Sequence, residues 1–140
     1  MIRRTAAVLT ALLIAGCGAG SAVYDYGQVT EGAKGRTVKV EIGKGQRFSL
    51  EVDDNPSVGD SWELVELPDP KVASYISKER EAKSDQPGAS GASRFVFNAK
   101  SPGTTTIKLF DCWRCPRDRV PVDEQSKQNS GEAVFQVTVE

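Results

Sequence analysis

Thr37–Val52 reads TVKVEIGKGQRFSLEV, and apolar and polar residues alternate in it on both sides of a glycine-rich turn. An alternation of period two places every second side chain on one face of a β-strand, so each half of the stretch predicts a strand with one buried face. The turn Gly43–Gly45 predicts that the two strands form a hairpin. The residues expected to face the core are Val38, Val40, Ile42, Phe48, Leu50 and Val52.

Shorter runs of the same kind follow along the chain and predict further strands at 61–67, 72–77, 94–99, 104–111 and 132–139. Two polar stretches, Lys78–Ser93 and Cys112–Gly131, predict long loops, with a short helix at Lys78–Lys83 as an alternative to part of the first. About seven short strands separated by turn signals predict one domain, an all-β, immunoglobulin-like antiparallel β-sandwich.

The N-terminus has the pattern of an export signal. Arg3 and Arg4 precede the apolar run Ala6–Ala15, which is too short to span a bilayer. The run closes at Ile14–Cys17, which resembles the end of a bacterial lipoprotein signal. The resemblance implies cleavage before Cys17 and a diacylglycerol on its thiol; an ordinary signal peptide with an incidental cysteine is the alternative.

These features divide the 140-residue chain into three parts. Residues 1–16 are predicted to be the signal peptide, residues 17–35 a lipidated flexible tether rich in Gly, Ala and Ser, and residues 36–140 the β-sandwich domain. We therefore expect an extracytoplasmic protein that is anchored by lipid to the bacterial cell membrane.

Composition excludes several functions. The chain has no histidine, which excludes Ser/His and Cys/His nucleophile pairs and zinc sites that use histidine. Its net charge is −1, and nothing in the sequence resembles a nucleic-acid binder, which would need a basic face. No cluster of carboxylates, lysines or tyrosines stands out, so we expect a protein that is not an enzyme and uses no cofactor. We also expect it to be a monomer.

Asn55–Trp62 reads NPSVGDSW and lies between two predicted strands. Pro56 fixes its own φ near −65°, Gly59 can adopt a positive φ, and Asn55 can hydrogen-bond the nearby backbone. These properties predict a shaped loop, for which a tight connection between strands is the simplest interpretation. Trp62 begins the next strand as a large apolar anchor.

The same stretch resembles the first signature loop of the chagasin family of cysteine-protease inhibitors. That loop reads Asn-Pro-Thr-Thr-Gly, followed by an aromatic residue, a variable residue and Trp. Val58 keeps a branched side chain without the hydroxyl group, and Asp60 replaces the aromatic residue. The positions that match outright or nearly are Asn55, Pro56, Ser57, Gly59 and Trp62.

Two later stretches resemble the other signatures of the family less closely. Gly88–Gly91 is similar to its Gly-x-Gly-Gly turn with Ser90 in place of one glycine, and Phe95 falls at the position of a family phenylalanine. The third signature combines Arg-Pro with an aromatic residue. In Asp111–Pro116 these residue types occur in another order between two cysteines, so the signature cannot be transferred residue by residue; Trp113 is expected to supply an exposed aromatic wedge.

Cys112 and Cys115 have three interpretations. A structural disulfide fits an oxidising compartment and would stiffen the tip of the loop. A thioredoxin-like redox pair fits the spacing, although the alternating strands and helices of that fold are missing. A metal site would need more ligands than these two thiols.

The resemblance implies a reversible, non-covalent inhibitor of papain-like cysteine proteases. Three loops at one end of the sandwich would act as a wedge in the active-site cleft of the protease. The alternatives are a membrane-anchored immunoglobulin-like binding module without protease inhibition, and a thiol–disulfide enzyme. The residues implied to bind the protease are Asn55, Pro56, Ser57, Val58, Gly59, Asp60, Gly88, Ala89, Ser90, Gly91, Trp113 and Arg114.

Overall fold

The structure is a computed structural model that describes residues 25–140. The predictions for the signal peptide and for lipidation at Cys17 lie outside the described residues. Among residues 25–140, no helix has the length and apolar character needed to cross a membrane.

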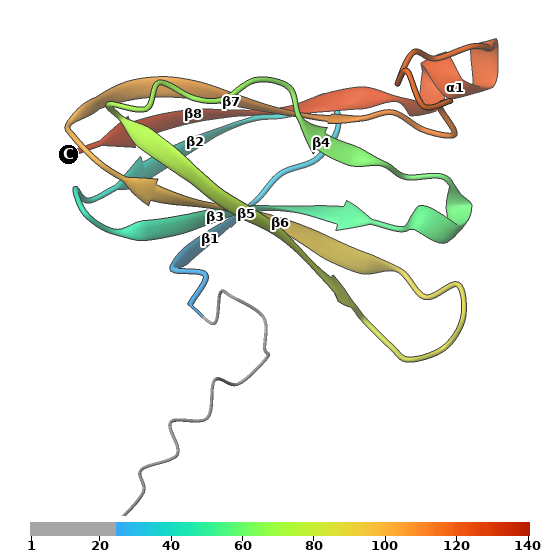
Figure 1. Ribbon diagram of the computed structural model, residues 1–140, viewed down its shortest axis with the longest axis horizontal. Helices are drawn as coiled ribbons and strands as arrows, with labels where there is room; N and C mark the ends of the chain where they lie inside the picture. The colour runs from blue at the N-terminus through green and yellow to red at the C-terminus, as the bar shows by residue number, and fades with distance from the viewer. Residues whose placement is uncertain (1–24) are drawn as a thin grey trace, which may run out of the picture.

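Two four-stranded sheets pack face to face, so the predicted all-β sandwich is confirmed (Figure 1). One sheet has the order β1-β3-β6-β5 and the other β2-β8-β7-β4. The strands are β1 (Gln28–Glu31), β2 (Thr37–Ile42), β3 (Arg47–Asp54), β4 (Trp62–Leu64), β5 (Ala73–Ala82), β6 (Gly91–Ala99), β7 (Gly103–Asp111) and β8 (Gly131–Val139).

The sheets are mixed rather than purely antiparallel as predicted. β1 pairs in parallel with β3, and β2 pairs in parallel with β8. The predicted hairpin between Val38–Ile42 and Phe48–Val52 is therefore wrong, because β2 and β3 belong to different sheets. The turn between them is a corner that carries the chain from one sheet to the other.

Three further corrections concern the extent of the elements. The tether predicted for residues 17–35 is wrong where β1 adds an eighth strand. The polar stretch predicted as a loop or short helix from Lys78 continues β5 to Ala82, since its backbone pairs with β6. The long loop after β7 contains the short helix α1 (Glu124–Asn129), which begins with a capping box between Asp123 and Ser126.

The core lies between the sheets and is built by the inward half of each alternating strand. The Phe48 and Phe97 rings stack with their centroids 5.3 Å apart, and both are fully buried. Trp62 is 2% exposed at the start of β4, and its Nε1 donates a hydrogen bond to the carbonyl oxygen of Asp53 at 2.9 Å. This tryptophan connects the loop that precedes it to the core.

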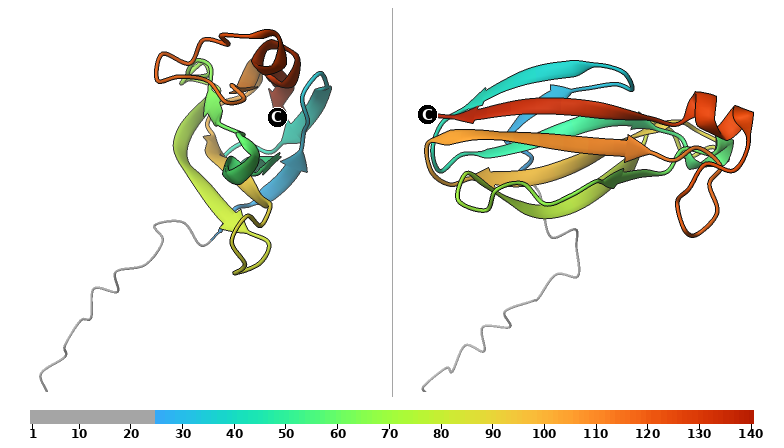
Figure 2. Two further views of the ribbon diagram at one scale, coloured as in Figure 1. Left: turned by 90° about the vertical axis from the view of Figure 1, so that its right-hand side faces the viewer. Right: turned by 90° about the horizontal axis from the view of Figure 1, so that it is seen from above.

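Strand directions separate the connections into two groups (Figures 1 and 2). β3 ends and β6 begins at one end of the sandwich, where Asp54 pairs with Gly91. β7 also ends there, where Asp111 pairs with Gly131. We call this end the loop end; it carries loop 1 (55–61), loop 2 (83–90) and loop 3 (112–130). The opposite, turn end carries the turns 43–46 and 100–102 and the C-terminus.

Candidate functional site

Loop 1 is a compact turn closed by its own hydrogen bonds. Pro56–Val58 form one turn of 3₁₀ helix capped by the side chain of Asn55, which accepts a hydrogen bond from the backbone amide of Ser57 at 3.2 Å. The amide of Asp60 donates to the carbonyl oxygen of Asn55, also at 3.2 Å. The residues that the sequence marked as a shaped loop therefore form one, with Pro56, Ser57 and Val58 exposed at its tip.

Gly59 occupies a position that requires glycine for two reasons. Its φ of +116° is rarely accessible to other residues. A Cβ placed on it would lie 2.4 Å from Cγ of Arg114, which is closer than non-bonded atoms approach. The glycine therefore permits both the return of loop 1 and the close approach of loop 3.

Loop 2 contacts loop 1 through a side chain. Oγ of Ser57 donates a hydrogen bond to the carbonyl oxygen of Gly88 at 3.2 Å. A shallow hollow of about 390 Å³ lies between the two loops, with Arg80 and Asp85 among its lining residues. The tips of the first two loops thus form one continuous surface.

Loop 3 contacts loop 1 through Arg114. The backbone amide of Arg114 donates to the carbonyl oxygen of Gly59 at 2.9 Å, and its Nε donates to that of Val58 at 3.3 Å. The guanidinium group lies over the ring of Trp113, 4.4 Å from the ring centre. Arg114 has a φ of +48°, so a non-glycine residue is held in the left-handed region at this contact.

Cys112 and Cys115 form a disulfide, as the first interpretation of the pair predicts. Cys112 is buried at the end of β7, whereas Cys115 is half-buried. The bridge encloses Trp113 and Arg114, so the disulfide fixes the residues of loop 3 that meet loop 1.

A cluster of charged groups around the buried Asp111 lies below loop 1. The fully buried side chain of Asp111 forms an ion pair with Lys34, at 2.8 Å between Nζ and Oδ2, and its Oδ1 accepts from the amide of Ser61 at 2.6 Å. Oδ2 of Asp60 accepts from the amide of Asn55 at 2.8 Å. Asp60 therefore points back into the loop instead of presenting a charge at its tip.

Burial raises the pKa of Asp60 above its ordinary value of 3.8. The negative charge of the neighbouring Asp111 also raises the pKa. The hydrogen bond from the Asn55 amide and the positive charge of Lys34 lower it. The net rise means that the fold disfavours the ionised form of Asp60.

The remainder of loop 3 is fixed to the sandwich by Arg119. Its guanidinium group donates to Oγ and to the carbonyl oxygen of Ser61, at 2.7 and 3.0 Å, and to the carbonyl oxygen of Phe110 at 3.3 Å. Nζ of Lys34 donates to the carbonyl oxygen of Asn129 at 2.7 Å. Loop 3 is thus held at both its start and its end.

The structure brings the three predicted loops together at one end, but their residues differ in accessibility. Val58 is 48% exposed. Trp113 is half-buried beneath Arg114 and lies next to Gly59 of loop 1, so it does not project as the expected wedge. Gly91 is buried as the first residue of β6. Among the residues predicted to bind a protease, the exposed ones are Pro56, Ser57, Val58, Gly88, Ser90 and Arg114.

Sequence reasoning missed the groups that hold the loops in place. Lys34 lies in the predicted tether, and Asp111 and Arg119 carry no motif. Their only sequence signal is charge next to predicted strand ends, which is also typical of ordinary solvent-exposed residues. In residues 25–140, no three His, Cys, Asp or Glu side chains are grouped closely enough to hold a metal ion.

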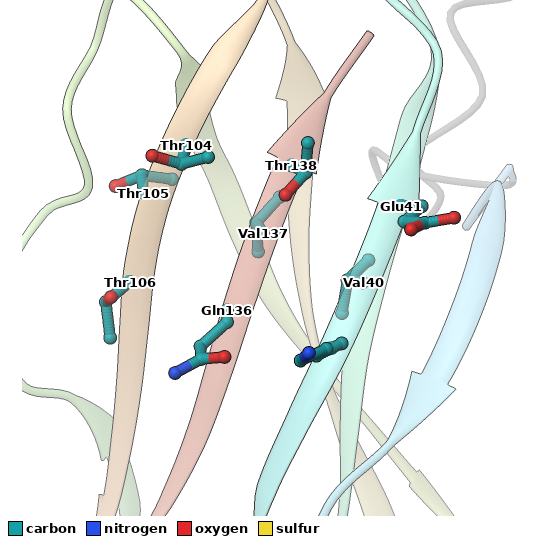
Figure 3. A pocket seen from close by; sticks show the side chains of 9 residues that line it. Val40, Glu41, Thr104, Thr105, Thr106, Gln136, Val137 and Thr138 are labelled. Carbon is teal, nitrogen blue, oxygen red and sulfur yellow. The ribbon is translucent and has the colours of Figure 1, made fainter.

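A second hollow lies away from the loops, on the outer face of β2, β8 and β7 (Figure 3). Its volume is about 390 Å³, and its lining is mainly threonine and glutamine side chains with the charged residues Lys39 and Glu41 at β2. The residues of this hollow belong to β-strands, whereas the loop end is built from the loops that connect strands.

Comparison with known proteins places these loops in a family. Residues 41–114 match the model of the chagasin family peptidase inhibitor I42. The matched segment covers more than half of the chain and runs from β2 through loops 1 and 2 to Arg114. No curated protein matches the chain.

Solved structures of inhibitors share the fold. The crystal structure of the cysteine protease inhibitor EhICP2 from Entamoeba histolytica has a TM-score of 0.57 at 17% identity and covers 81% of this chain and 95% of its own. The solution structure of Amebosin has a TM-score of 0.56 at 20% identity, with 81% and 97% covered.

The third structure is that of PbICP-C in complex with falcipain-2; the TM-score is 0.55 at 13% identity, with 81% and 92% covered. At these identities the likeness shows the sandwich fold alone, and the family match carries the assignment. Because the match includes the glycine-closed turn of loop 1 and extends to the arginine that contacts it, this chain belongs to the chagasin family of peptidase inhibitors, which are not enzymes.

Proposed function

We propose that the protein is a reversible, non-covalent inhibitor of papain-like cysteine proteases, and that the loop end enters the active-site cleft. The observation that carries this proposal is the network linking the three loops: Ser57 bonds to Gly88, and Arg114 bonds to Val58 and Gly59. Loops held in one shape before binding lose little conformational entropy on docking.

Loop 1 is the part proposed to block the catalytic centre. Pro56, Ser57 and Val58 are exposed at its tip, and its backbone is wound into a 3₁₀ turn rather than extended. Proteases of this kind cleave extended chains, so a wound backbone closed by internal hydrogen bonds resists cleavage while it occupies the cleft. Gly88 of loop 2 and Arg114 of loop 3, which bond to Ser57 and Val58, then flank this tip.

We also propose that Cys17 carries the lipid anchor and that the domain faces away from the membrane. The part of the chain that the structure describes begins at Asp25, whose carbonyl oxygen accepts a hydrogen bond from Arg47 at 3.2 Å. Arg47 begins β3 at the turn end, opposite loop 1. A tether that joins the domain at this end leaves the three loops free to meet a protease. Mass spectrometry of the mature N-terminus tests the anchor, and an unmodified Cys17 would contradict it.

Titration of papain with residues 18–140 tests the inhibitory function. We expect stoichiometric loss of peptidase activity that recovers on dilution, with the inhibitor still intact on a gel. Full activity at micromolar protein would contradict the proposal.

The hollow on the outer face of β2, β8 and β7 favours the alternative, a membrane-anchored binding module without protease inhibition. That surface is polar and lies outside the loop end. A protein that leaves papain active, and whose partner is lost when this hollow is filled by Thr106→Arg, would support the alternative.

A further inference from the structure

The residues that join loop 3 to loop 1 lie inside a very small covalent ring. Cys112 and Cys115 are three positions apart and their Cα atoms are separated by 5.5 Å. Between them, Arg114 is held at a φ of +48°. An unconstrained arginine has little tendency to remain in this left-handed conformation. The disulfide therefore supports a backbone shape that the sequence alone disfavours.

That backbone shape determines where Arg114 can donate. Its amide reaches the carbonyl oxygen of Gly59 at 2.9 Å, and its Nε reaches that of Val58 at 3.3 Å. Both acceptors belong to loop 1, and Val58 is the exposed apolar residue at its tip. Arg114 thus acts on the candidate blocking loop through two hydrogen bonds that start from inside the ring.

We infer that Arg114 is a positioning residue for loop 1 and that the Cys112–Cys115 disulfide holds it in place, so that reducing the disulfide weakens inhibition. This inference rests on the proposed function. It adds a redox dependence to the same surface, and it gives Arg114 a role inside the inhibitor in addition to its proposed place beside the blocking tip.

The chemistry requires a dithiol reductant. Its thiolate attacks Sγ of the half-buried Cys115, forms a mixed disulfide there, and expels the thiolate of Cys112, which takes up a proton. The second thiol of the reductant then displaces Cys115 and closes the oxidised reductant, so two electrons and two protons pass to the protein. Sγ of the buried Cys112 lies 3.2 Å from the carbonyl oxygen of Arg119, which can accept a hydrogen bond from the new thiol.

The consequence falls on loop 1 and leaves the sandwich intact. β7 ends at Asp111, so neither cysteine of the disulfide belongs to a strand. Loss of two hydrogen bonds to loop 1 is expected to weaken inhibition about tenfold. Because the catalytic cysteine of the target protease must also be reduced to act, reducing surroundings would activate the protease and weaken its inhibitor together.

The test uses residues 18–140, which contain both sheets and lack Cys17. Papain is activated with a dithiol and exchanged into oxygen-free buffer, and its inhibition constant is measured with the oxidised protein and with the protein kept in dithiol. Cys112→Ser/Cys115→Ser is measured in both buffers as the matched control. Amide hydrogen exchange of residues 55–60 in the free protein reports the order of loop 1, and Arg114→Ala is compared with Arg114→Lys in the oxidised state.

We expect the oxidised protein to inhibit about tenfold more tightly than the reduced protein. The serine variant should match the reduced protein in both buffers. Residues 55–60 should exchange faster after reduction and in Arg114→Ala, a change that a purely direct contact of Arg114 with protease would not cause. Equal inhibition by the oxidised and reduced forms, with both thiols shown to be free, would overturn this inference alone. Lack of inhibition by either form would overturn the proposed function and this inference with it.

Discussion

The two ends of the sandwich share one core but are closed in different ways. At the turn end, the closing hydrogen bonds are mainly between backbone groups. The amide of Lys44 donates to the carbonyl oxygen of Glu140 at 2.8 Å, and the amide of Gly45 donates to the carbonyl oxygen of Ala99 at 3.0 Å. At the loop end, side chains link one loop to another, chiefly Ser57, Arg114 and Arg119.

The loop end therefore depends on particular residues more than the turn end does. Backbone hydrogen bonds are available to almost any sequence, so the turn end should tolerate substitution except where it needs a positive φ, as at Gly45. The loop end keeps its shape only while specific side chains remain in place. The two ends should therefore respond differently to matched changes.

Trp62→Ala should give the largest effect, because it removes the anchor that joins loop 1 to the core. The side chain is 2% exposed, and its loss leaves a cavity and an unpaired carbonyl group at Asp53. We expect the free energy of unfolding, measured by urea denaturation, to fall by about 3–5 kcal/mol. Val65→Ala, at a residue 50% exposed, is the control and should change it by less than about 0.5 kcal/mol. A Trp62 variant as stable as this control would show that the anchor is not needed.

Gly59→Val compares the two ends directly. At Gly59 the new side chain would collide with Arg114, whereas Gly45 at the turn end has a φ of +81° and open space around it. Both valine variants are expected to lose about 1–2 kcal/mol from backbone strain. Only the Gly59 variant should raise the inhibition constant for papain, by roughly 100-fold. Equal inhibition by the two variants would remove loop 1 from the site.

Asp60→Asn tests whether the charge of Asp60 below loop 1 destabilises the fold. Burial raises the pKa of Asp60 above 3.8, so the folded protein binds this proton more tightly than the unfolded chain does. Stability from this group is therefore full below pH 3.8 and is lost as the pH rises through the folded pKa. The asparagine variant keeps an acceptor for the Asn55 amide and avoids this loss, so its melting temperature should exceed that of the wild type at pH 7 and approach it below pH 3.8. An advantage that grows with acidity would reverse the predicted sign.

Thr106→Arg should have the smallest effect. It fills the hollow on the outer face of β2, β8 and β7, which lies away from the three loops. We expect inhibition of papain to change less than about twofold, within the usual range for surface substitutions. A large loss of inhibition would move the binding surface from the loop end to this face.

Strand faces could be predicted from sequence because alternation reports burial locally. Val40, Ile42, Phe48, Leu50 and Val52 all face the core as expected. Strand partners could not be predicted, since the same alternation is compatible with any neighbour. The predicted hairpin failed for this reason: β2 pairs with β8, which lies far along the chain.

The second half of β5 was missed because polar residues replace the apolar pattern at this sheet edge. Lys78 packs its ammonium group 5.6 Å from the centre of the Phe95 ring and donates to the carbonyl oxygen of Trp62 at 2.6 Å. A lysine with a long aliphatic stem can cover the core while it satisfies a polar group. A hydrophobicity pattern does not register such a residue as a strand position.

The candidate site likewise contains some residues whose roles could be predicted from the sequence and others whose roles could not. Asn55, Pro56 and Gly59 could be assigned to a shaped loop because each has a characteristic backbone preference. The roles of Asp60 and Arg114 could not, because they depend on residues from distant parts of the chain that meet only in the fold. Asp60 was among the residues predicted to bind the protease, and in the structure it turns toward the cluster with Asp111 and Lys34.

Amide hydrogen exchange of the protein with and without papain compares both ends in one experiment and shows directly which end meets the protease. We predict that papain slows exchange in residues 55–60, 84–90 and 113–114, while residues 43–46 and 100–102 exchange at the same rate as in the free protein. Protection confined to the turn end or to the outer face of β2, β8 and β7 would contradict the assignment of the loop end as the inhibitory surface.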